Sequence, residues 1–168
     1  MVYSDHFAIA DDFIAHLDGV MDGIADPFVQ SRYLGFVALS AVTVFELAIK
    51  EVFIAFAEKK HVVLGNIARS KFEQINGRIK IGSLENEFIR PFGDKYLNRF
   101  KRKLADAEYD SLRAGRGSIK ASYGNIIQWR HDFVHRALFP GTTNYGELKA
   151  SYGLAKGVVH CLNATMTR

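Results

Sequence analysis

The stretch YLGFVALSAVTVF, residues 33–45, decides the fold, because it is the most apolar segment of the 168-residue chain. A helix formed by it would be apolar nearly all round, and such a helix has to be buried on nearly all sides. The 13 apolar-rich residues are followed at once by Glu46, and then by Lys50 and Glu51. This length is too short to span a bilayer, so the stretch predicts the central helix of a globular core and no membrane partner.

Working outward, the central helix is expected to begin at Pro27, with Asp26 as its N-cap, and to end near Lys59. A separate acidic helix is expected before it, from about Ser4, as N-cap, to Ile24. The apolar stripe of that first helix consists of Phe7, Ala10, Phe13, Ile14, Leu17 and Met21.

After the central helix, the 3.6-residue period returns in every remaining segment, and no segment alternates with period two. The further helices are expected from Val63 to Asn76 before Gly77, from Ser83 with an interruption at Pro91 and Gly93, from Ser118 to Leu138, and from Asn144 to Ala164. Ser118 is expected to cap its helix, and Asn144 with Glu147 has the spacing of a capping box. The sequence therefore predicts an all-α fold, an up-and-down bundle of five or six helices in one domain, residues 1–168.

Charge is distributed unevenly along the chain. Residues 1–27 contain six aspartates and no lysine or arginine, whereas the rest of the chain holds 22 basic and 12 acidic residues. A basic body of this kind suits a polyanion such as RNA, and it suits an ordinary solvated surface equally well. The start of the chain lacks the pattern of a signal peptide and the lone Cys161 cannot form an internal disulfide, so we expect a cytoplasmic protein.

The stretch RHDFVH, residues 130–135, carries the candidate chemistry. The helical neighbours of Arg130 at three and four residues are apolar, namely Ile126, Ile127, Phe133 and Val134. An isolated guanidinium in such surroundings is costly unless it is paired, reaches water or faces a cleft. His131 and His135 share one helix face, and on an ideal helix Arg130 points about 140° away from His135.

These residue types suit the cleavage of RNA by its own 2′-hydroxyl. The reaction needs a proton acceptor, a proton donor and positive charge around the phosphorus. A histidine serves either proton role near neutral pH, and arginine grips phosphate with two parallel hydrogen bonds.

The Arg-x4-His pattern on the penultimate helix, together with ELAIK (residues 46–50) on a long apolar helix upstream, resembles the HEPN superfamily, nearest to its RiboL-PSP-like branch. The resemblance covers roughly residues 34–160. It implies a homodimer in which two motifs converge on a shared cleft, commonly a metal-independent endoribonuclease without a cofactor that acts as a toxin or antiviral effector, a toxin having a neutralising antitoxin as partner. Many members have Asn after the arginine and Gly after the histidine, where this chain has His131 and Arg136.

The predicted site residues fall into three groups. The catalytic residues are Arg130, His135 and His131, the supporting residues are Glu46, Lys50 and Asp132, and the additional RNA-binding residue is Arg136.

Three alternatives stay open on the sequence alone. The first is a non-catalytic HEPN module that binds nucleotide, RNA or a partner protein. The second is a metal site at His131 and His135, for which no third ligand is evident, so the expected metal is none. The third is a structural ion pair between Arg130 and Glu46, which is compatible with catalysis.

The predicted dimer interface contains the helix of residues 118–138. Its expected apolar arc consists of Tyr123, Ile126, Ile127, Phe133, Val134 and Ala137, which is wider than an edge helix needs for its own chain. At a two-fold axis one such helix doubles the local number of arginines and histidines.

Overall fold

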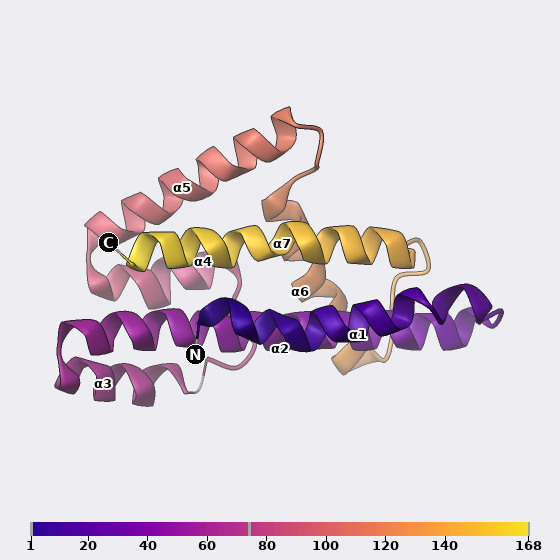
Figure 1. Cartoon of the computed structure of the whole chain (residues 1–168), viewed down its shortest axis with the longest axis horizontal. Coiled ribbons are helices and arrows are strands. Elements are labelled where there is room, and N and C mark those ends of the chain that lie inside the picture. The colour runs from indigo at the N-terminus through magenta and orange to yellow at the C-terminus, as the bar shows by residue number, and fades with distance from the viewer. Residues whose placement is uncertain (1, 74, 168) are drawn as a thin grey trace.

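The computed structural model describes residues 2–73 and 75–167, and the regular structure of these residues is entirely helical (Figure 1). The helices with eleven or more residues are α1 (Ala8–Asp18), α2 (Pro27–Lys60), α3 (Val62–Phe72), α5 (Asp94–Arg113), α6 (Ile119–Arg136) and α7 (Tyr145–Met166). The single turns are η1 (Tyr3–Phe7), η2 (Met21–Gly23), α4 (Ile81–Ser83), the π-helical η3 (Leu84–Ile89) and η4 (Arg90–Phe92). The predicted all-α fold is confirmed.

Helix α2 is the central element, as the stretch at residues 33–45 predicts. It contacts α1, α3, α6 and α7. In Figure 1, α1 passes in front of α2, α7 runs alongside, and α6 crosses behind at a steep angle. The fully buried ring of Phe45 stacks on Tyr123 of α6 and on Tyr152 of α7, with ring centroids 5.6 and 5.7 Å apart. No helix of the described residues is long and apolar enough to cross a membrane.

The expected first helix, residues 4–24, is divided in the structure. Ser4 lies inside η1 rather than at an N-cap, because Asp5 accepts the hydrogen bond from the Val2 amide at 3.0 Å. Helix α1 then ends at Asp18, because the next residue is Gly19 and glycine weakens helices. The apolar stripe is nevertheless correct, since all its members are buried apart from the partly buried Phe13.

The segment after α3 also departs from the expectation. Helix α3 ends at Phe72 rather than Asn76, and the chain turns inward so that Ile75 and Ile79 are both fully buried. Gly77, between them, has a φ of +74°, a conformation that glycine adopts without strain. The next helical stretch begins at Ile81, so Ser83 does not open it.

The two helices that follow are capped as the sequence predicts. The Ser118 hydroxyl accepts from the Ala121 amide at 2.9 Å, and the Asn144 side chain accepts from the Glu147 amide at 2.8 Å. Helix α6 stops at Arg136 and not at Leu138, because Ala137 adopts a left-handed conformation with φ 52° and ψ 28°.

Candidate functional site

The motif occupies the last two turns of α6, whose start is fixed by the preceding helix. The Glu108 carboxylate of α5 accepts hydrogen bonds from the Ser118 hydroxyl and the Lys120 amide. Partial burial raises the pKa of Glu108, but these hydrogen bonds, with one from Ile119, bring it below its ordinary value. Glu108 therefore stays ionised and anchors α6 at neutral pH.

Arg130 is half-buried and faces the loop after α3. Its Nη1 lies 3.8 Å from the position that a Cβ on Gly77 would occupy. Its Nε is buried, and within the described part of the chain the guanidinium forms no hydrogen bond or ion pair. An unpaired guanidinium at the edge of a core has a strong tendency to attract an anion.

Glu46 and Lys50 hold that loop against α2. Glu46 Oε1 accepts from the Gly77 amide at 2.7 Å, and Lys50 Nζ donates to the Glu73 carbonyl at 3.0 Å. No ion pair within 4.0 Å joins Arg130 to Glu46 among the residues described, so the alternative of a structural ion pair between them is not supported. Arg130 and Glu46 instead both approach Gly77, whose backbone amide occupies the Glu46 carboxylate.

His131 and His135 lie on the solvent side of α6. Both side chains are exposed, and their ring centroids are 4.6 Å apart with an interplanar angle of 48°. Two imidazoles at this distance can contact neighbouring oxygens of one phosphodiester.

Asp132 connects its helical neighbours and does not contact the histidine pair. Its Oδ2 accepts from Gln128 Nε2 at 2.9 Å, and its Oδ1 lies 3.5 Å from Arg136 Nη1. The ion pair orients Arg136, whose side chain is still 67% exposed and free to meet a phosphate.

The structure thus places the predicted residues of α6 on different sides of that helix, with Glu46 and Lys50 across from Arg130 on α2. The histidines face solvent on one side, whereas Arg130 points to the Gly77 loop on another. The deeper neighbour on Arg130's side is Tyr123, which donates to the Ile79 carbonyl at 2.7 Å. Burial and the Glu46 charge raise the pKa of Tyr123, so its hydroxyl stays protonated and serves the core.

The expected apolar arc around Arg130 is largely covered by the chain itself. Tyr123, Ile126 and Ile127 are buried, because α6 packs on α2 and α7. Phe133 fills the space above Gly35 of α2, where any added Cβ would overlap its ring. The width of the arc is therefore explained by contacts within one chain, and only its C-terminal part, at Val134 and Ala137, is exposed.

An exposed apolar surface nevertheless borders the motif. It consists of Phe28, Val29, Phe36, Val134 and Leu138, from the start of α2 and the end of α6. Phe36 meets Phe133 edge to face at 5.3 Å, and Arg32 lies over the Phe28 ring while it donates to the Ala137 carbonyl at 2.8 Å. We call this set the α2–α6 surface.

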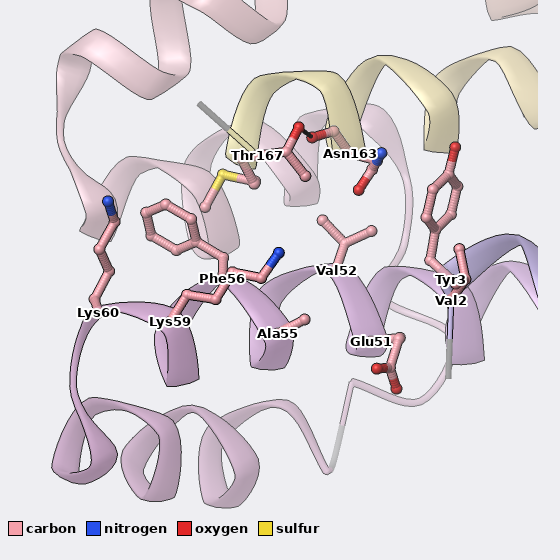
Figure 2. Close-up of a pocket in the computed structure, with 11 residues that line it drawn as sticks. Val2, Tyr3, Glu51, Val52, Ala55, Phe56, Lys59, Lys60, Asn163 and Thr167 are labelled. Atoms are coloured by element: carbon pink, nitrogen blue, oxygen red, sulfur yellow. Dashed lines mark hydrogen bonds between the residues drawn. The ribbon is translucent and has the colours of Figure 1, made fainter.

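The remaining candidates for a ligand site are a metal cluster and a surface pocket away from the motif. Within residues 2–73 and 75–167, no cluster of three or more His, Cys, Asp or Glu side chains is suited to a metal ion. A pocket of about 410 Å³ lies between the second half of α2, the end of α7 and the start of η1, and Figure 2 shows the residues that line it. Its lining includes Lys59, Lys60 and Asn163, and none of the predicted site residues.

Comparison with known proteins assigns the chain to a family. The sequence model of the RiboL-PSP-HEPN family matches residues 4–167. The chain belongs to this HEPN family. No curated protein and no solved structure matches it significantly. HEPN membership confirms the resemblance inferred from RHDFVH and extends it to the acidic N-terminal segment.

Sequence reasoning did not identify the Gly77 loop or the start of α2 as parts of this region. Gly77 was expected only to end a helix, yet its amide binds Glu46 and it lies beside Arg130. Phe28 and Arg32 lie in the first turns of α2, where no sequence motif marks them. Only the folded chain shows that they lie beside Ala137. A local signal does exist at Gly35, since a small residue within an apolar helix often marks a close approach.

Proposed function

We propose that this HEPN protein is a metal-independent endoribonuclease that acts as a homodimer and leaves a 2′,3′-cyclic phosphate. The observation that carries the proposal is the exposed His131–His135 pair, with rings 4.6 Å apart, on the same helix as Arg130, whose buried Nε has no hydrogen-bond partner among the described residues. Membership of the RiboL-PSP-HEPN family supports it.

The proposed chemistry is an attack of the RNA 2′-oxygen on the adjacent phosphorus. One imidazole removes the 2′-hydroxyl proton as the O2′–P bond forms, and a second donates a proton to the leaving 5′-oxygen as the P–O5′ bond breaks. His135 and His131 take these two proton-transfer roles. Arg130 stabilises the charge on the non-bridging oxygens, and Arg136 contacts a flanking phosphate.

The separation of Arg130 from the histidines favours a composite site. On an ideal helix the arginine and His135 point about 140° apart, so a single motif closes poorly around one phosphate. A two-fold axis near the end of α6 would place the arginine of one protomer beside the histidines of the other. The α2–α6 surface gives such a dimer exposed apolar side chains to bury.

The two arginines of such a dimer would repel each other in the absence of a ligand. A bound RNA phosphate relieves that repulsion. A cytoplasmic role as toxin or antiviral effector, restrained by a neutralising antitoxin, is consistent with this chemistry and is part of the proposal.

The test is cleavage of mixed RNA by the purified protein in excess EDTA. We expect the wild type to cleave and to leave cyclic phosphate ends, and His135→Ala to lose about 10²-fold or more of the rate, because a proton-transfer group is removed. Product ends are identified by their resistance to phosphatase until acid opens the ring.

The control is His16→Ala, which removes an exposed histidine of α1 that is remote in sequence from the motif. Circular dichroism of both variants establishes that the fold is retained. Equal cleavage by wild type and His135→Ala would refute the catalytic assignment. RNA binding by the wild type without any cleavage would identify the non-catalytic HEPN module instead.

A further inference from the structure

A second pocket lies on α6 one helical turn before the histidine pair. It has a volume of about 300 Å³ and is lined by Lys80, Ile81, Tyr123, Gly124, Ile127 and Gln128. Its wall opposite α6 is the segment that follows the Gly77 loop, and the hydrogen bond from Tyr123 to the Ile79 carbonyl fixes the two walls together. The pocket is therefore preformed in the free chain.

The absence of a side chain at Gly124 keeps the pocket open. Gly124 is exposed within α6, and a Cβ added there would meet no atom within 4 Å. A glycine inside a helix costs about 1 kcal/mol relative to alanine, and nothing in the packing requires it here. The space it leaves is consequently available to a ligand.

The lining combines apolar walls with a polar rim. Ile81 is partly buried and Ile127 is buried, so both present hydrocarbon to the pocket. Gln128 donates its amide to Asp132, which orients a side chain whose carbonyl oxygen has no partner among the described residues. Lys80 is exposed and has no acidic partner in the described part of the chain. Apolar walls with an amide and one cation match a nucleobase with its phosphate.

The pocket is aligned with the histidines along the helix. Gly124, Gln128, His131 and His135 fall within an arc of about 60° on an ideal helix. The centre of the Gly124–Gln128 turn lies about 10 Å along the axis from the middle of the histidine pair, at a rise of about 1.5 Å per residue. This is the scale of the distance between a phosphate and the base of an adjoining nucleotide.

We propose that this pocket binds the RNA base adjoining the scissile phosphate and so sets the sequence preference of cleavage. The effect on cleavage rests on the proposed function, whereas base binding itself does not require catalysis. Lys80 contacts the phosphate on the far side of that base.

The experiment uses Gly124→Leu, which fills the pocket from its exposed side, and the matched control Gly153→Leu. Gly153 is an exposed glycine inside α7 whose added Cβ also meets nothing within 4 Å. Cleavage of a random-sequence RNA in EDTA is followed by sequencing of the new ends. The wild type and Gly153→Leu should share a preference for particular bases at one position beside the cut, and Gly124→Leu should lose it and cleave about tenfold more slowly.

A binding measurement separates this proposal from the nuclease assignment. Fluorescence anisotropy with 2′-O-methyl oligonucleotides, which lack the attacking hydroxyl, should show about tenfold weaker binding to Gly124→Leu than to Gly153→Leu. Cleavage that keeps its rate and base preference in Gly124→Leu would overturn the pocket and leave the nuclease standing. Base-dependent binding that is lost in Gly124→Leu, with no cleavage by the wild type, would overturn the nuclease and support the pocket. Equal binding by the two variants would overturn the pocket whatever the cleavage result.

Discussion

At the scale of single residues, Ala137 is held in an unfavourable conformation two residues after the motif. It is the one non-glycine residue with positive φ among those described, and the Leu138 amide bonds back to the Asp132 carbonyl at 3.4 Å. This pattern at a helix end is usually made by glycine, because a Cβ is strained in the left-handed region. The chain thus accepts local strain to turn sharply where His135 and Arg136 end the helix.

Relieving this strain should stabilise the protein. We expect Ala137→Gly to raise the free energy of unfolding by about 1 kcal/mol, the left-handed penalty less the greater unfolded-state entropy of glycine. For a chain of this size that corresponds to a rise in Tm of roughly 2–4 °C. Thermal unfolding followed by circular dichroism measures it.

Ala114, at the C-terminal end of α5, provides the control because its φ of −80° carries no such strain. Ala114→Gly should leave Tm unchanged or lower it slightly. A Tm for Ala137→Gly at or below that of the wild type would show that the Ala137 conformation is not strained in solution.

At the scale of elements, α1 is fastened to α7 by charges at both of its ends. Lys149 Nζ donates to Asp18 at 2.6 Å, Tyr145 donates to the same carboxylate at 2.9 Å, and Lys156 donates to Asp11 at 2.6 Å. The hydrogen bonds from Lys149 and Tyr145 lower the pKa of Asp18. Two carboxylates of the acidic segment, Asp11 and Asp18, therefore have their counter-charges on α7.

This pKa shift fixes the pH range in which Asp18 contributes to stability. A carboxyl group with a lowered folded-state pKa stabilises the fold above its unfolded value, near 3.8, and loses that contribution as the pH falls through the folded value. Wild type should therefore unfold at a higher temperature than Asp18→Asn at pH 7, and the difference should shrink as the pH falls below 3.8 and through the folded-state pKa of Asp18.

The matched control is Asp12→Asn, since Asp12 is exposed on the same helix and forms no ion pair among the described residues. Its Tm should track that of the wild type at every pH. A gap between wild type and Asp18→Asn that is the same at pH 7 and in acid would contradict the ionic account.

The sequence predicts those elements whose ends depend on local chemistry. Asp26, Ser118 and Asn144 cap their helices as expected, because an N-cap involves only the first turn. The break at Gly19 and the early end of α3 were not predicted. The early end of α3 depends on the burial of Ile75, which no local pattern encodes. The break of the first helix does have a local signal in Gly19, but an isolated glycine is also tolerated inside helices.

The candidate site divides in the same way. The spacing of Arg130, His131 and His135 is visible in the sequence, and so is the shared face of the two histidines. The missing ion pair to Glu46 was not predictable, because the competing donor is a backbone amide 31 residues along the chain, at Gly77. The apolar arc was interpreted as an interface because periodicity indicates burial without indicating which chain provides it.

At the scale of the whole molecule, the α2–α6 surface is the feature that bears on assembly. Phe28 is 63% exposed and Leu138 is 62% exposed, and they belong to elements joined by the Arg32–Ala137 hydrogen bond. Exposed apolar side chains gathered beside a candidate site favour burial against a partner.

Charged residues on this surface should separate the proposed dimer. We expect the wild type to be a dimer at micromolar concentration and Phe28→Glu combined with Leu138→Glu to be a monomer, because like charges would meet across a two-fold axis. RNA cleavage should fall with dissociation, since both chains contribute to the proposed cleft. Size-exclusion chromatography with light scattering gives the mass.

Ile67→Glu is the control, because Ile67 is 57% exposed on α3, an element outside the α2–α6 surface. It should remain dimeric. A monomeric wild type would refute the dimer. Dissociation caused only by Ile67→Glu would place the interface on α3 instead.

The fastening of α6 at its first turn has an electrostatic consequence for the other end. Backbone amides at a helix start carry partial positive charge, and here the Glu108 carboxylate already occupies them. The motif lies at the opposite terminus, where the carbonyl groups carry partial negative charge and oppose an anion. A phosphate there gains nothing from the macrodipole and depends on discrete cationic side chains, whose attraction mobile ions screen within about 10 Å at 0.1 M salt. Polynucleotides, which bring several phosphates to several cations at once, are therefore favoured over mononucleotides, and most strongly at low ionic strength, because affinity falls more steeply with salt as the number of phosphate contacts rises.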